Sequence, residues 1–172
     1  MESLSILNFV IVAIVESIFS VRWHPGYFQV GIPIYCKTYP FNGTADTPIG
    51  ETALNEAFKK RFTVSFVFKE IAPNIFAFRE KLFELNLITY TPVMHGRLTV
   101  NQGAREIRVV GLLNWWILAF VLTVLIAFSK DMGPTLLLVL LLGVIYLFQK
   151  GKYDKVGHFA YEWNSRDWSS ER

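Results

Sequence analysis

Three long apolar stretches dominate the hydropathy pattern of this chain. The first, Leu4 to Val21, is interrupted by Glu16 and a few small polar residues. The second, Val109 to Phe128, and the third, Met132 to Phe148, contain no charged residue. A bilayer core about 30 Å thick is crossed by roughly 20 apolar residues in a helix. The pattern therefore predicts three transmembrane helices, of which the third is the shortest.

The residues around each stretch refine these spans. We expect 1–21 to be a retained span and not a secretory signal peptide, because no Lys or Arg precedes the apolar run. Gly133-Pro134 suits a helix start, since proline is tolerated in the first turn. A helical hairpin is therefore predicted, with spans at 109–128 and 136–148 and a short external loop at 129–135. A buried hairpin helix of a soluble domain is the alternative for the third stretch.

The segment 22–108 alternates between apolar and polar positions in short runs, which is typical of strands with one buried face. A hairpin is indicated at His95–Leu112, because the Gly-containing turn Asn101-Gln102-Gly103 separates two alternating runs. The absence of a sustained strand–helix–strand alternation argues against a parallel sheet. The other predicted elements are strands at Tyr27–Tyr39 and Arg61–Lys69, a helix at Glu51–Lys60, a helix favoured over a strand at Pro73–Leu87, and a short strand at Leu87–Thr91.

The fold class predicted from these patterns is an α+β membrane protein. One transmembrane helix is N-terminal, two form a C-terminal hairpin, and a small antiparallel-sheet domain at 22–108 is inserted between the first and second helices. The tail at 149–172 is aromatic and mixed in charge, and its residues Val156, Phe159, Ala160 and Trp163 have helical spacing. Two interpretations are open for it: an amphipathic helix on the lipid head groups, or docking onto the 22–108 domain or a neighbouring protein.

Basic residues near the span ends predict the orientation. Lys and Arg flanking transmembrane helices favour the cytoplasmic side, and here they are Arg22, Arg105, Arg108, Lys150 and Lys152. We therefore expect an external N-terminus, a cytoplasmic 22–108 domain and a cytoplasmic C-terminus, in a bacterial inner or intracytoplasmic membrane. Aromatic residues at the predicted cytoplasmic interface agree with this orientation: Trp115, Trp116, Tyr146 and Phe148.

Composition narrows the class of partner. Hydrophobic residues make up 52% of the chain and charged residues 18%, and the formal net charge is only +3. Nucleic acid is therefore not expected as a partner, whereas membrane lipids and other integral membrane subunits are. The basic run Lys59-Lys60-Arg61 is a candidate for contact with anionic lipid head groups.

Candidate chemistry is sparse. We predict no catalytic, cofactor-binding or metal-binding residues, because phosphate-binding loops and nucleophile elbows are absent from the sequence. The single cysteine, Cys36, is interpreted as a small buried hydrophobe on the apolar face of its strand. The three histidines, His24, His95 and His158, lack a metal-ligand spacing, and interfacial hydrogen bonding is their expected role.

Glu16 is the one ionisable residue inside a predicted span. Burying a charge in lipid is costly, so such a residue is a functional candidate. Three interpretations are open: an interfacial or structural role, a contact to another protein, and a proton relay. The residues expected to contact the membrane or a partner are Glu16, Arg22, Trp115, Trp116, Lys150, Lys152, Phe159 and Trp163.

Three functions compete. The first is a non-enzymatic accessory or assembly subunit of a larger membrane complex, such as an energy-transducing respiratory or photosynthetic one. The second is a membrane-tethered module that binds lipid head groups, peptide or a small ligand. The third is a small transporter or channel component, for which the only amides in the spans are Asn8 and Asn114. The sequence favours the first, because it contains no reactive constellation.

Overall fold

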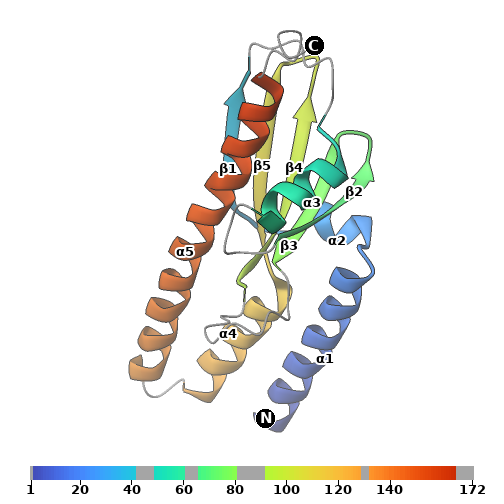
Figure 1. Cartoon of the computed structure of the whole chain (residues 1–172). Coiled ribbons are helices and arrows are strands. Elements are labelled where there is room, and N and C mark those ends of the chain that lie inside the picture. Colours follow the sequence, from blue (N-terminus) through green and yellow to red (C-terminus); the bar gives the residue numbers. More distant parts are fainter. Residues whose placement is uncertain (1, 42–48, 61–65, 81–91, 129–131, 166–172) are drawn as a thin grey trace, which may run out of the picture.

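The computed structural model describes residues 2–41, 49–60, 66–80, 92–128 and 132–165, which form an α+β unit with apolar helices at one end (Figure 1). The chain order of the helices and strands is α1 (Glu2–Val21), α2 (Pro25–Gln29), β1 (Pro33–Pro40), α3 (Glu51–Lys60), β2 (Phe66–Ala72), β3 (Ile75–Glu80), β4 (Met94–Asn101), β5 (Glu106–Leu113), α4 (Trp115–Ala127) and α5 (Met132–Ser165).

The described strands form one five-stranded sheet in the order β1-β5-β4-β3-β2. Every neighbouring pair is antiparallel, so the predicted antiparallel sheet is confirmed. The predicted hairpin is also confirmed: β4 and β5 pair from Met94 with Leu113 at one end to Asn101 with Glu106 at the other. The predicted helix at Glu51–Lys60 is α3.

Helices α3 and α5 cover the same face of the sheet and enclose its core (Figure 1). The core is aromatic: the ring of Tyr153 on α5 lies 4.9 Å from that of Phe78, and the ring of Phe58 on α3 lies 5.2 Å from that of Phe68. Gly96 makes room for this packing, because a Cβ atom there would overlap the Phe78 ring. The core therefore fills the space between the helices and the sheet with large rings.

The edge strand β2 is closed by side chains of α3. The Asn55 amide accepts a hydrogen bond from Phe68 N (2.9 Å) and donates one to Phe68 O (3.0 Å), as a neighbouring strand would. Glu51 accepts a further bond from Glu70 N at 2.9 Å. Unpaired edge groups invite pairing with another chain, and α3 satisfies several of them here.

The predicted strand at Tyr27–Tyr39 is corrected at both its start and its faces. Residues 25–29 form α2, with proline at the start of the helix, and the strand begins at Pro33. Tyr35 and Tyr39 face the core under α5, whereas Cys36 is exposed. The interpretation of Cys36 as a buried hydrophobe is therefore wrong, because the larger aromatic rings on the other face are the ones that α5 covers.

The helix favoured at Pro73–Leu87 is also wrong over its described part. The chain turns between β2 and β3, and Asn74 takes a left-handed conformation with φ of 61°. Asparagine tolerates this region better than most residues. Phe76 and Phe78 then point into the core of the sheet. The remainder of that segment and the predicted strand at Leu87–Thr91 lie outside the described residues.

The last two apolar stretches are divided differently from the prediction. The end of β5 takes up residues 109–113, whose Val109, Val110 and Leu112 are buried in the sheet, and α4 begins only at Trp115. Helix α5 starts at Met132, inside the predicted 129–135 loop, and runs 34 residues to Ser165. Its second half packs on the sheet through Val156 and Ala160, so docking onto the domain is confirmed and the interpretation of 149–165 as a head-group helix is wrong.

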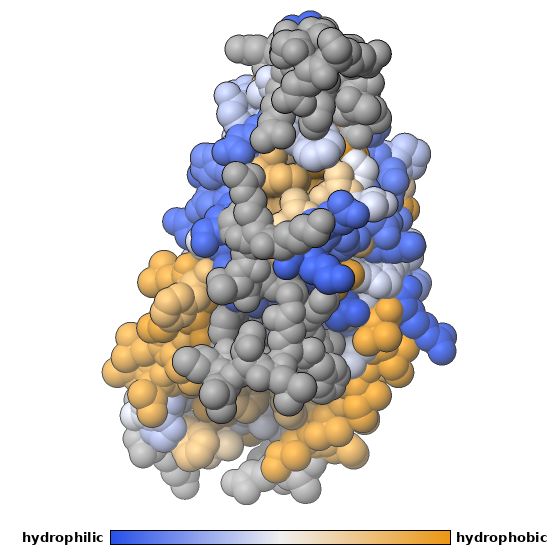
Figure 2. Space-filling view, viewed as in Figure 1, coloured by the Kyte–Doolittle hydropathy of each residue, from blue (hydrophilic) through white to orange (hydrophobic). Residues whose placement is uncertain are grey.

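The apolar helices gather at the end of the molecule away from the sheet (Figures 1 and 2). Among the described residues, one helix is long and apolar enough to cross a membrane, at Gly133–Ser165, and the apolar helices Ile6–Val21 and Trp115–Ala127 are shorter. The structure thus contains one candidate span where the sequence predicted three, partly because β5 takes five residues of the second stretch.

Candidate functional site

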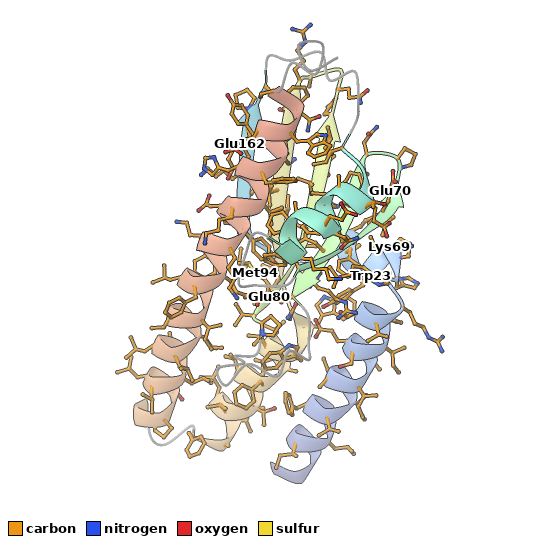
Figure 3. All side chains as sticks on the ribbon, in the orientation of Figure 1. Trp23, Lys69, Glu70, Glu80, Met94 and Glu162 are labelled. Carbon is orange, nitrogen blue, oxygen red and sulfur yellow. The ribbon has the colours of Figure 1, made fainter. Side chains whose placement is uncertain are left out.

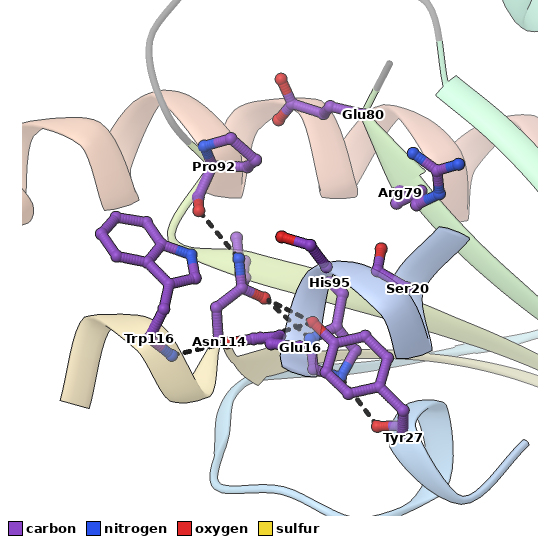
Figure 4. A pocket seen from close by; sticks show the side chains of 11 residues that line it. Glu16, Ser20, Tyr27, Arg79, Glu80, Pro92, His95, Asn114 and Trp116 are labelled. Carbon is purple, nitrogen blue, oxygen red and sulfur yellow. Dashed lines mark hydrogen bonds between the residues drawn. The ribbon is translucent and has the colours of Figure 1, made fainter. Parts of the chain in front are cut away.

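Glu16 is buried at the junction between the apolar helices and the sheet, where it caps α4 (Figure 4). One carboxylate oxygen accepts a hydrogen bond from Trp115 N at 3.0 Å, and the other accepts one from Trp116 N at 2.5 Å. The first N–H groups of a helix have no partner within the helix, and a negative charge at this end is favoured by the helix dipole. The carboxylate of α1 therefore replaces the usual side-chain cap of α4.

Tyr27 on α2 supplies the third hydrogen bond to Glu16. Its hydroxyl donates to Glu16 Oε1 at 2.6 Å. Burial raises the pKa of Tyr27 above its ordinary value, and the neighbouring Glu16 carboxylate raises this pKa further. The phenol therefore stays protonated and remains a donor. Helix α2 is thereby tied to α1, and indirectly to the start of α4.

Asn114 and His95 continue the network into the sheet. Asn114 occupies the N-cap position of α4 but does not cap it. Its amide instead donates to Pro92 O at 2.8 Å, and its Oδ1 atom lies 2.8 Å from His95 Nδ1. His95 Nε2 lies 3.0 Å from the backbone oxygen of Tyr27. A neutral imidazole carries one N–H, so His95 can donate to only one of these two oxygens at a time.

Burial keeps His95 neutral. Desolvation lowers the pKa of His95 to about 4, although the contacts with Asn114 and Tyr27 act in the opposite direction. The imidazole is stacked on the Tyr27 ring at a centroid distance of 4.0 Å and meets the Phe28 ring edge to face at 5.3 Å. The ring is therefore part of the packing between α2 and β4 at neutral pH.

A cavity of about 70 Å³ adjoins this network (Figure 4). It is large enough for water, but well below the roughly 300 Å³ of a typical small-molecule site. Arg79 of β3 lines it, and its guanidinium carbon lies 5.0 Å from the centre of the Trp23 ring. The other lining residues are Glu16, Ser17, Ser20, Tyr27, Glu80, Pro92, Met94, His95, Asn114 and Trp116.

A second polar cluster joins α5 to the sheet at the same junction, where Figure 3 labels Glu80 and Met94. The fully buried amide of Gln149 accepts hydrogen bonds from Val93 N (2.8 Å) and Met94 N (3.2 Å). Gln149 also donates to Glu80 at 2.9 Å, and Lys152 forms a salt bridge with Glu80 at 2.8 Å. The polar side chains that follow the apolar half of α5 therefore hold the start of β4 and the end of β3.

The residues predicted to contact the membrane or a partner do not form one site. Glu16, Trp115 and Trp116 meet at the α1–α4 contact, and Lys152 lies in the α5 cluster. Phe159 and Trp163 pack toward the core near Phe58. Arg22, Lys150 and Lys59 are exposed at separate places; the Lys60 side chain and Arg61 lie outside what the structure describes.

Sequence patterns gave no indication that Tyr27 and Gln149 take part in these clusters, and for His95 they indicated only interfacial hydrogen bonding. Asn114 stood out in the sequence only as an amide within an apolar stretch, which does not indicate its partners. The partners of Tyr27, His95 and Gln149 could not be predicted, since they come from elements far away in the sequence. Among the residues that the structure describes, no group of three His, Cys, Asp or Glu side chains has an arrangement suited to a metal ion.

Comparison of this chain with protein-family models, with curated proteins and with solved structures gives no match.

Proposed function

We propose that this protein is embedded in a membrane by three apolar helices and acts as a non-enzymatic accessory or assembly subunit of a larger membrane complex. One observation carries the proposal: large apolar side chains are exposed on α1, α4 and the first half of α5, while Glu16 of α1 is turned inward toward the start of α4. Water would be a poor solvent for this end of the molecule. Figure 2 shows the apolar surface below the more polar sheet.

The first half of α5 offers the broadest apolar surface. Only 11% of the residues in its apolar 18-residue stretch are buried, which argues against a core helix of a soluble protein. Exposed apolar positions cover roughly 200° of its circumference at 3.6 residues per turn. These positions are Leu136, Leu137, Val139, Leu140, Leu141, Val144, Leu147 and Phe148. Such a surface suits lipid tails or the helices of neighbouring subunits.

The polar groups at the junction support an accessory role over transport or catalysis. All three hydrogen bonds of the Glu16 carboxylate go to structural partners, which leaves little for a proton pathway. The core of the sheet domain is filled by aromatic rings, and the cavity beside Glu16, of about 70 Å³, is small for a ligand. These features argue for a scaffold that fixes the angle between membrane helices and a surface domain.

The proposed orientation follows the basic residues. Arg22 follows α1, and Lys150 and Lys152 follow the apolar half of α5, so all three lie toward the sheet end. Lys and Arg at such positions favour the cytoplasmic side. We therefore place the sheet domain and the C-terminus in the cytoplasm, and the N-terminus and the α4–α5 connection outside.

Site-specific photo-crosslinking in the native host tests the subunit proposal. A benzophenone amino acid at Leu137 or Val144, on the exposed apolar side of α5, is expected to give adducts with other membrane proteins. The same group at Thr38, which is exposed on β1, is the matched control. Purification in a mild detergent with mass spectrometry should recover the same proteins. A chain that purifies alone, with crosslinks only to lipid, would overturn the proposal.

A further inference from the structure

An exposed apolar pair lies outside the three apolar helices. Val30 and Ile32, between α2 and β1, are 65% and 53% exposed. In the described part of the chain, Tyr161 is the only other exposed large hydrophobic residue outside the apolar helical stretches. The oxygen of Ile32 accepts a hydrogen bond from Leu113 N at 2.9 Å. Leu113 lies two residues before Trp115, the first residue of α4, so this pair lies at the height where the apolar helices meet the sheet.

Cations flank the same segment. Arg22, exposed, begins the turn from α1 into α2. Arg97 extends from the sheet face beneath α2, and its guanidinium donates to the oxygen of Gln29 (3.5 Å), directly before Val30. A basic group therefore stands at each end of α2. We name the set Arg22, Val30, Ile32 and Arg97 the basic corner.

The charge around the basic corner has one sign. No Asp or Glu occurs between Ser17 and Ala45. The acidic residues of the elements nearby are either occupied or distant: Glu16 is buried and caps α4, Glu80 forms a salt bridge with Lys152, and Glu106 lies at the far end of β5, opposite Asn101. His24, at the start of α2, is exposed and adds no negative charge. The corner thus has a positive rim beside an apolar pair.

We propose that the basic corner binds the head group of an anionic phospholipid in the leaflet on the sheet side, an inference that rests on the membrane embedding proposed above. Val30 and Ile32 enter the boundary of the acyl chains, and Arg22 and Arg97 contact the phosphate. Basic residues at an anionic membrane surface each raise binding about fivefold. Free phosphate would meet the same cations but would gain nothing from the apolar pair.

The position of each arginine along its strand decides whether it can reach the proposed membrane surface. Arg108, on the same face, lies five residues from Leu113, or about 16 Å along the strand. This exceeds the screening length of about 8 Å at physiological salt. Arg97 lies three residues along β4 from Met94, the residue that pairs with Leu113. Its side chain, however, extends as far as Gln29. Arg105 and Arg108 therefore serve as controls with the same charge.

Native mass spectrometry of lipid retention tests the proposal. The full chain in mild detergent is offered equal amounts of phosphatidylglycerol and phosphatidylcholine. Wild type is expected to retain phosphatidylglycerol preferentially, and Arg22→Gln/Arg97→Gln to lose roughly 10- to 30-fold of this preference. Arg105→Gln/Arg108→Gln should keep it, and so should Arg22→Lys/Arg97→Lys, which preserves the charge. Val30→Ser/Ile32→Ser should weaken retention of both lipids, and millimolar inorganic phosphate should not compete.

Three outcomes would overturn the basic corner: no preference in wild type, equal losses in the two Gln pairs, or displacement of the lipid by inorganic phosphate. Alkaline extraction of membranes from the same cells separates this failure from failure of the embedding. A chain that is released by alkali contradicts the proposed function as well. A chain that stays in the membrane without preferring phosphatidylglycerol contradicts only the lipid site.

Discussion

At the scale of single residues, Glu16 holds the most consequential position. Caps normally come from the residue before a helix, but Asn114 turns its side chain toward Pro92 and His95 instead. The carboxylate that takes its place comes from α1. Charge-assisted hydrogen bonds to backbone N–H groups are among the stronger ones in proteins, so one side chain fixes the contact of α1 with the start of α4.

Replacing Glu16 tests this role. Glu16→Ala should lower the free energy of unfolding by about 3 kcal/mol, because two helix N–H groups and the Tyr27 hydroxyl lose a buried partner. Glu16→Gln should fall in between, since its one oxygen can still cap a single N–H. Ser17→Ala, next in the chain and exposed, is the control. Thermal unfolding in detergent measures all three; equal melting temperatures for Glu16→Ala and Ser17→Ala would refute the cap.

Because His95 is buried in the folded protein, we expect the free energy of unfolding to depend on pH. Its pKa is about 4 in the folded protein and near 6.5 when unfolded. As pH falls below 6.5 the unfolded chain takes up the proton first, so stability should decline by up to about 3 kcal/mol between pH 6.5 and 4, and this term should be flat above pH 7. His95→Gln should show a shallower slope than His24→Gln when melting temperature is followed against pH. Identical slopes would contradict the assignment.

At the scale of elements, local signals decided what could be predicted. The β4–β5 hairpin and α3 could be predicted because their signals, a Gly-containing turn and a helical apolar face, depend only on residues close together in the sequence. Helix α2 was missed because Tyr27 and Phe28 are buried by His95 and Ala77, which lie far away in the sequence. Glu16 could be singled out from its place in an apolar run, but its partners depend on how α1, α2 and α4 meet.

Helix α5 joins the two ends of the molecule. Substitutions at two of its glycines test how closely it packs on the sheet. Gly151 is exposed with open space around it, so Gly151→Ala should stabilise the protein by roughly 0.5–1 kcal/mol through helix propensity. At Gly157 a Cβ atom would overlap the buried Tyr39 ring, whose hydroxyl bonds to Asp154. Gly157→Ala should therefore destabilise by about 1–3 kcal/mol. Unfolding experiments on both variants check the opposite signs; a shared sign would contradict the close packing of Gly157 against Tyr39.

At the scale of the whole molecule, the polar contacts between the apolar helices and the sheet lie in one zone and connect the two ends of the protein. Glu16, Asn114 and Gln149 lie where α1, α4 and α5 leave the apolar end and meet the sheet. Their hydrogen bonds are internal, so the apolar surface of the helices faces outward while the polar groups face the domain. The sheet is thereby held at a fixed height and angle above the apolar end, as the proposed role in assembly would require.

This arrangement predicts which positions are reachable from outside an intact cell. Cys36 is the only cysteine and is exposed on β1, so under the proposed orientation a membrane-impermeant maleimide should label it only after the membrane is opened. In a Cys36→Ser background, Asp131→Cys, in the α4–α5 connection, should react in intact cells, and Lys60→Cys should not. The reverse pattern would invert the orientation. Labelling of all three positions in intact cells would mean that the apolar end does not cross the bilayer, because a barrier can hide a position only if the chain passes through it.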